Sequence, residues 1–236
     1  MLFRSDALAQ TVTRPTPNDD LLAWLAQKAD RPELVDRWLA TARADSDLVP
    51  WLTARRAMRT GNARVTIEAL RSLVERSAAT KDGPWEWTVP GPTIRGVRDW
   101  QNRTARRDRA RAELGVLLMS EGQFVPALEH FLAAGDWADA AYVAERVLET
   151  DELRCFVDDR PTAYSDSDRL GVRDLLARRL AREGRLEAAI EYSRIPQSMA
   201  RLRDATRRGL DESLPAGERA AALRDAGRIT RFEGME

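Results

Sequence analysis

The 236-residue chain has few of the residues from which metal and nucleophilic sites are built. It contains one histidine and one cysteine, which excludes an internal disulfide, a cysteine-based zinc site and a two-histidine metal site. It has no run of eighteen apolar residues, and 32% of its residues are charged, so we expect no contact with a membrane. The first residues do not follow the basic-then-apolar order of a secretory signal. These absences favour a cytoplasmic location, although a periplasmic protein without disulfides would have the same composition.

An excess of charge of either sign is also absent. The 38 basic residues balance the 38 acidic ones, so no overall field attracts nucleic acid or an anionic membrane. Only Lys28 and Lys81 are lysines, and all other basic side chains are arginines. This bias is typical of a GC-rich bacterial genome, and no function is inferred from it.

Patterns typical of β-strands are missing, and helix-forming residues dominate. The sequence therefore predicts an all-α chain. We expect helices over about 20–28, from 30, over 47–60, 62–79, 93–120, 124–134, 137–149, 151–158, 168–182, 186–193 and 197–209, and from 213. Asp30 and Asn62 are the expected caps of the second and fourth helices, and Pro32 follows Asp30 as an early helical proline.

Two segments interrupt the helical pattern. Residues 1–18 are polar and contain two prolines, which predicts a flexible lead-in. Residues 80–92 contain three prolines and two glycines, which predicts an inserted loop carrying Trp85 and Trp87. We expect residues 19–236 to form a single helical-repeat domain that continues beyond residue 236.

Three glycines at turns give the chain an internal period. Gly61, Gly122 and Gly184 are separated by 61 and 62 residues. Similar residues recur at fixed distances from them: Ala54, Gly115 and Ala177 seven before; Ala57, Leu118 and Leu180 four before; and Thr66, Ala127 and Ala189 five after. Small residues at such positions allow two antiparallel helices to approach closely.

The segment 108–150 resembles the tetratricopeptide repeat most closely. Leu114, Gly115, Ala127 and Phe131 match the repeat's L-G and A-x₃-F positions, while Arg111 replaces its tryptophan. The resemblance extends more weakly over 47–200, and the period of about 61 exceeds the family's roughly 34 residues, which requires inserted loops or extra helix pairs. It implies antiparallel helix pairs stacked as an α-solenoid. Another α-solenoid or a helical bundle is the alternative.

No group in the sequence predicts catalysis or binding of a cofactor or metal. We expect His130 at a surface or edge position and Cys155 as a packed core thiol, because Leu153, Phe156 and Val157 flank it. The acidic pairs Asp19/Asp20, Asp136/Asp139 and Asp158/Asp159 fit helix caps or turns. Phosphate-loop, dinucleotide and nucleophile-elbow motifs are absent.

The residues expected to bind a partner are arginines placed on the repeat. Arg55 and Arg59 lie six and two residues before Gly61, and Arg178 and Arg182 lie at the same positions before Gly184. Each pair is four residues apart and so shares one helical face, and Arg109 can point the same way. Such faces would form a cationic groove for carboxylate or phosphate, unless nearby Asp and Glu neutralise them.

The two tryptophans of the inserted loop, Trp85 and Trp87, provide a further candidate. They can present a rigid aromatic anchor to a partner, or they can fold back over a seam between helix pairs. The second interpretation is the one we favour from the sequence.

The leading functional hypothesis is a non-catalytic scaffold for protein–protein interaction. Its concave face would bind an extended peptide, and the arginines favour an acidic one. One alternative is nucleic-acid binding through the arginines of 95–111 around Trp100, which a steep salt dependence would reveal. Another is a regulatory portion of a larger enzyme.

Overall fold

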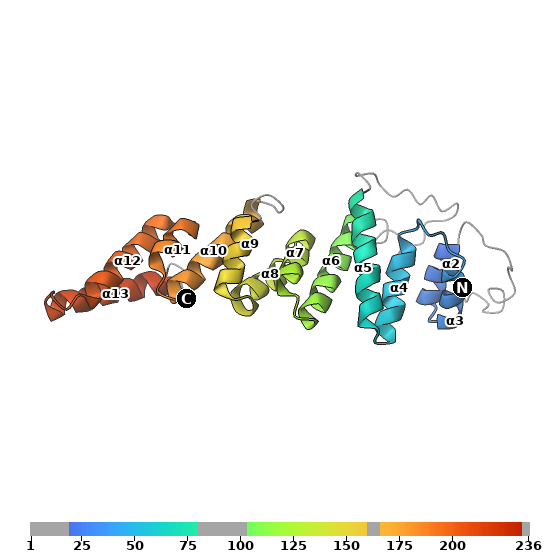
Figure 1. Ribbon diagram of the computed structural model, residues 1–236, viewed down its shortest axis with the longest axis horizontal. Coiled ribbons are helices and arrows are strands. Elements are labelled where there is room, and N and C mark those ends of the chain that lie inside the picture. Colours follow the sequence, from blue (N-terminus) through green and yellow to red (C-terminus); the bar gives the residue numbers. More distant parts are fainter. Residues whose placement is uncertain (1–18, 80–102, 160–165, 233–236) are drawn as a thin grey trace. The chain divides into compact units, whose positions relative to one another are not determined.

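The computed structural model describes residues 19–79, 103–159 and 166–232. Within these ranges it contains twelve α-helices, one π-helical segment and no strand (Figure 1), which confirms the all-α prediction. None of the described helices is both long and apolar enough to cross a bilayer. The expected lead-in 1–18 and inserted loop 80–92 lie outside the described residues.

The chain divides into two compact units, Met1–Leu117 and Leu118–Glu236. The helices of the first unit are α2 (Asp19–Lys28), α3 (Pro32–Leu39), α4 (Leu48–Arg59), α5 (Ala63–Ala79) and most of α6 (Arg103–Ser120). Those of the second are α7 (Phe124–Ala134), α8 (Trp137–Tyr142), the π-helical η2 (Val143–Val147), α9 (Thr150–Asp159), α10 (Asp166–Arg182), α11 (Leu186–Tyr192), α12 (Pro196–Leu210) and α13 (Ala216–Phe232). A single repeat domain over 19–236 stays a prediction.

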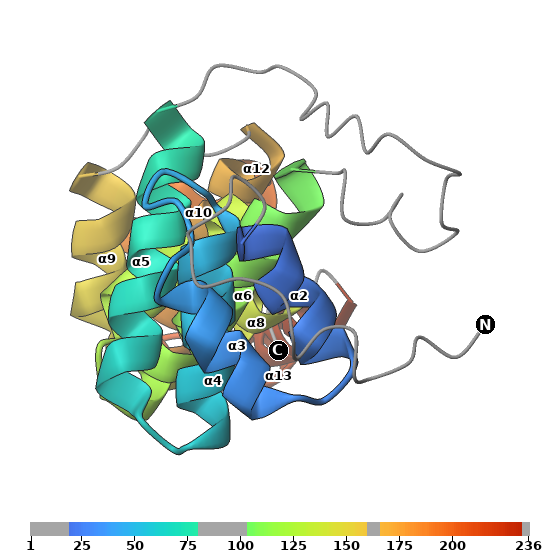
Figure 2. The same cartoon turned by 90° about the vertical axis from the view of Figure 1, so that its right-hand side faces the viewer.

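Within each unit the main contacts join helices that follow one another in the chain. In the first unit α2 packs on α3 and α4 packs on α5, and α2 also contacts α4; these helices have the blue to blue-green colours in Figure 2. In the second unit α10, α11, α12 and α13 each pack on the next, and α9 packs on α10. Contacts of this nearest-neighbour kind are typical of helical-repeat proteins.

The three glycines that define the period occupy turns of one geometry. Gly61, Gly122 and Gly184 have left-handed φ angles of 70°, 75° and 76°. At Gly184 the glycine N–H donates to the carbonyl of Ala181 (3.0 Å), and the N–H of Arg185 donates to the carbonyl of Leu180 (2.8 Å). The same two bonds occur at the other two glycines. This is the Schellman motif, which pairs carbonyls that the end of a helix would otherwise leave unsatisfied.

Two further turns share this geometry and were not predicted. Gly135 has φ 72°, and Asp30 has φ 53° as a non-glycine residue. The N–H of Asp30 donates to Gln27 (3.3 Å), and the N–H of Arg31 donates to Ala26 (3.0 Å). Asp30 therefore ends α2, and its prediction as the cap of the next helix was wrong. Aspartate is one of the few non-glycine residues that visit this conformation readily.

The start of α3 follows from that correction, whereas the start of α5 was predicted correctly. Arg31 is the N-cap of α3 and makes no side-chain cap bond, while Pro32 occupies its first turn as expected. Asn62 does cap the fourth helix, because its Oδ1 accepts the N–H of Val65 at 3.1 Å. The predicted helix 137–149 is instead α8 followed by η2, which ends at an extended Leu148.

Equivalent positions around all five turns are buried. The fourth residue before the left-handed residue is Ala26, Ala57, Leu118, Phe131 or Leu180, and the fifth after it is Val35, Thr66, Ala127, Ala140 or Ala189. Each of these side chains is at most 5% exposed. The backbone geometry of the turn thus fixes which side chains of the flanking helices face inward.

The turn account predicts opposite effects for two Gly→Ala changes in the second unit. An added Cβ meets nothing within 4 Å at either Gly184 or Gly227, and only Gly184 has a left-handed φ. We expect Gly184→Ala to lower the free energy of unfolding by about 1–2 kcal/mol. Gly227→Ala, within α13, should raise it by up to about 1 kcal/mol. Urea titrations followed by circular dichroism measure both, and equal effects would refute the account.

The contact between α12 and α13 predicts a second effect. A Cβ on Gly209 would lie 2.5 Å from Cδ2, 2.6 Å from Cγ and 3.3 Å from the backbone N of Leu223. We expect Gly209→Ala to destabilise the chain by about 1–3 kcal/mol because the site is overpacked. Leu223→Ala added to that variant should restore part of the loss in the same titration. An unchanged loss in the double variant would contradict this packing.

Candidate partner-binding site

Two arginines of the first unit converge on one carboxylate. Helix α4 places Arg55 one turn after Trp51, so that the guanidinium carbon lies 4.0 Å from the centre of the indole ring. Helix α6 places Arg109 one turn before Glu113. Arg55 Nη2 lies 2.5 Å and Arg109 Nε lies 3.0 Å from the same Glu113 Oε1. We call Trp51, Arg55, Arg109 and Glu113 the Glu113 cluster.

The Glu113 cluster carries more positive than negative charge. Two guanidinium groups share one carboxylate, and both lie near the indole face, with Arg109 5.7 Å from its centre. The side chains of Arg55 and Glu113 are 23% and 22% exposed, whereas that of Arg109 is 66% exposed. An anionic group that approached Arg109 would therefore meet a cation that its own partner balances only in part.

Helix α6 repeats this two-to-one arrangement nearby. Asp108 lies between Arg107 and Arg111, at 3.6 Å and 4.0 Å. Burial lowers the pKa of Arg111, and the charge of Arg107 lowers it further. The Nε of Arg107 is buried and has no hydrogen-bond partner among the residues that the structure describes. The described part of α6 therefore carries more arginines than carboxylates, and this excess of positive charge favours an anionic ligand.

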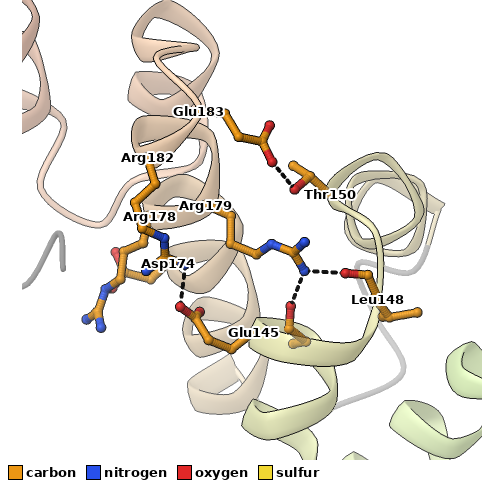
Figure 3. A network of polar contacts seen from close by, with 9 residues as sticks. Glu145, Leu148, Thr150, Asp174, Arg178, Arg179, Arg182 and Glu183 are labelled. Atoms are coloured by element: carbon orange, nitrogen blue, oxygen red, sulfur yellow. Dashed lines mark hydrogen bonds and ion pairs between the residues drawn. The ribbon is translucent and has the colours of Figure 1, made fainter.

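The other predicted arginines form ion pairs as well. Arg59 lies 2.9 Å from Asp30, which links α4 to the turn after α2. In the second unit Arg178 lies 3.1 Å from Asp174 within α10, and Arg182 pairs with Glu145 of η2 (Figure 3). The structure thus brings Arg55 and Arg109 together in the first unit and places Arg178 and Arg182 on one side of α10. Trp85 and Trp87 lie outside the described residues.

A further arginine of α10, not singled out from the sequence, supports the backbone of the second unit. Arg179 Nη1 donates to the carbonyls of Ala144 (2.8 Å) and Leu148 (2.5 Å) at the end of η2 (Figure 3). Ala144 lies within η2 and Leu148 directly follows it, so this one guanidinium nitrogen bonds both to the π-helical segment and to the residue after it. Beside this contact the hydroxyl of Thr150 donates to the carboxylate of Glu183. The sequence did not predict the π-helical segment, and for this reason it did not predict the role of Arg179.

The single cysteine corrects another prediction. Cys155 was expected in the core, but it is exposed on α9. Leu153 and Phe156, three residues apart, form the buried stripe of this helix. Cys155 lies off that stripe, so its apolar neighbours in sequence do not bury it. His130 is half-buried on α7.

The acidic pairs take mixed roles. Asp136 caps α8 as expected, because it accepts the N–H of Asp139 at 3.4 Å. Asp20 is 4% exposed, and it accepts the N–H of Leu21 (2.8 Å) and the hydroxyl of Ser46 (2.5 Å). Among the described residues, no set of three or more His, Cys, Asp and Glu side chains is placed to hold a metal ion.

Comparison of the chain with protein-family models, with curated proteins and with solved structures finds no match. The functional interpretation therefore depends on the geometry of the clusters themselves. Of those described so far, the Glu113 cluster is the one that combines several predicted residues with an uneven charge ratio. It is the candidate site of the first unit.

Adjacent arginines of α10 allow a matched test of these roles. Arg179→Met would leave two backbone carbonyls without their donor, and we expect a loss of about 1–3 kcal/mol in the free energy of unfolding. Arg178→Met removes only an ion pair within one helix and should change stability by less than about 0.5 kcal/mol. Urea titrations compare the two. A loss from Arg178→Met equal to that from Arg179→Met would contradict the assignment.

Proposed function

We propose that this chain is a non-catalytic helical-repeat scaffold of tetratricopeptide type that binds an acidic segment of a partner protein. The observation that carries the proposal is the sharing of one Glu113 oxygen by Arg55 and Arg109. A carboxylate of the partner would complete the charge balance of the Glu113 cluster. The open side chain of Arg109 is the first group that it would meet.

The spacing of turns in the first unit supports the repeat type. Asp30 and Gly61 have the same backbone geometry and lie 31 residues apart, close to the family's roughly 34. Each joins a packed pair, α2 with α3 and α4 with α5. Alanines stand seven residues before both turns, and both are at most 1% exposed. In the second unit Gly122 and Gly135 are only 13 residues apart, so the period there is irregular.

The chemistry of arginine favours a carboxylate ligand. The planar guanidinium donates two parallel hydrogen bonds to a carboxylate, and each charge-assisted bond contributes about 1.5–3 kcal/mol. Stacking of Arg55 on Trp51 holds one donor in place before binding, which reduces the conformational entropy lost on binding.

A compact anion also fits this surface better than a long polyanion. Acidic side chains occur among the arginines of the first unit: Asp36 pairs with Arg56 at 2.6 Å, and Asp45 pairs with Arg43 at 2.6 Å. The hydrogen bond from Arg56 lowers the pKa of Asp36, so this ion pair favours the charged form of that carboxylate. These charges would repel the successive phosphates of a nucleic acid.

The proposal predicts a charge-specific loss of peptide binding. Fluorescence anisotropy of a labelled peptide rich in Asp and Glu should show affinity about 10- to 100-fold weaker for Arg109→Glu than for wild type. Arg64→Glu makes the same charge change at a side chain that is 86% exposed on α5, and its affinity should stay within about twofold.

Equal losses in the two variants would indicate a general charge effect and refute the site. If a single-stranded oligonucleotide of equal charge binds more tightly than the peptide, and its affinity falls steeply with salt, the ligand of this site is a nucleic acid and not an acidic peptide.

A further inference from the structure

The second unit has an apolar hollow between α7 and α9. Its volume is about 460 Å³, and it is lined by Val125, Asp151, Glu152, Cys155, Phe156 and Asp159. Its accessible wall is mostly apolar, and Val125, Cys155 and Phe156 supply the less polar side chains. The volume lies within the range of about 300–1,000 Å³ typical of ligand pockets.

The remaining lining residues are all carboxylates. Asp151 lies 3.1 Å from Arg185, and Glu152 accepts the N–H of Glu149 at 2.9 Å, so both also have roles within the chain. The surrounding residues 121–159 contain ten Asp or Glu and two arginines. Arg182 of α10 and Arg185, the N-cap residue of α11, form ion pairs with this region, and most of that negative excess stays in place. The hollow is therefore apolar inside and negative at its rim.

We infer that this hollow binds a basic segment of a partner protein, in which one apolar side chain is flanked by arginine or lysine. The apolar side chain would enter against Val125 and Phe156, and the flanking cations would face Asp151 and Asp159. Charge complementarity selects this occupant, since the rim repels acidic segments. An apolar anchor inside a polar rim is also the usual arrangement of a binding hot spot.

This inference does not depend on the proposed function of the first unit. The two surfaces lie in different units and select ligands of opposite charge. If Arg109→Glu does not weaken binding of the acidic peptide, the proposal for the hollow still stands. If the hollow does not bind the basic peptide, the proposal for the Glu113 cluster still stands. If both stand, the chain is a scaffold with two chemically distinct docking surfaces.

The single cysteine of the chain reports directly on occupancy of the hollow. Cys155 is exposed and lines it, so alkylation of the full chain by iodoacetamide labels this one position. The probe is a blocked peptide, Gly-Ser-Arg-Leu-Arg-Ser-Gly. At a peptide concentration about ten times its Kd, the alkylation rate should fall about tenfold, because the unoccupied fraction falls by that factor.

Three variants and a second peptide separate this site from general charge effects. Val125→Lys and Asp159→Lys should each weaken binding of the labelled peptide by about fivefold or more. Glu212→Lys makes the same charge change as Asp159→Lys at an exposed residue after α12, and its affinity for the peptide should stay within about twofold of wild type. Replacing the peptide leucine by serine should weaken binding about tenfold, since the apolar anchor is lost. Thermal unfolding verifies that each variant is folded.

Wild-type affinity in both Val125→Lys and Asp159→Lys would overturn the inference, and so would equal protection of Cys155 by the serine peptide. Analytical ultracentrifugation of the full chain tests whether a second copy of the chain occupies the hollow instead. Self-association that Asp159→Lys abolishes would assign the hollow to a second copy and overturn the partner proposed here.

Discussion

The described fold depends on a backbone conformation that most residues avoid. At five helix ends the chain enters the left-handed region, and the next amide then bonds back to the carbonyl four residues before the left-handed one. This closes the end of one helix and sets the direction of the next. Because the inward-facing positions lie at fixed distances from the turn, a small repeated set of residues is sufficient to build several helix pairs.

Glycine explains why much of this could be predicted. Gly61, Gly122 and Gly184 mark turns visibly in the sequence, and small or apolar residues at constant offsets identify the buried faces. The turns at Gly135 and Asp30 were missed, and at Asp30 the reason is that an aspartate two residues before a proline is also typical of a helix start. The spacing of 31 residues between Asp30 and Gly61 was the available signal. The π-helical segment gave no comparable signal.

The side-chain clusters were less predictable because their partners are distant in sequence. Helical spacing placed Arg55 and Arg109 on comparable faces, but the carboxylate that joins them lies 58 residues from Arg55. The sequence indicated that nearby Asp and Glu could neutralise these arginines, but it did not identify which acidic residue pairs with which arginine. Cys155 shows the same limit at shorter range: its neighbours are apolar, yet the helical period of Leu153 and Phe156 turns it outward.

Amide hydrogen exchange of the ¹⁵N-labelled chain tests the turn geometry most directly. The amides that follow the left-handed residues are those of Arg31, Asn62, Gln123, Asp136 and Arg185, with donor–acceptor distances of 2.8–3.0 Å. The account predicts that all five exchange more than about tenfold slower than unstructured amides, because each is bonded within a closed helix end. Unprotected exchange at these amides would contradict it.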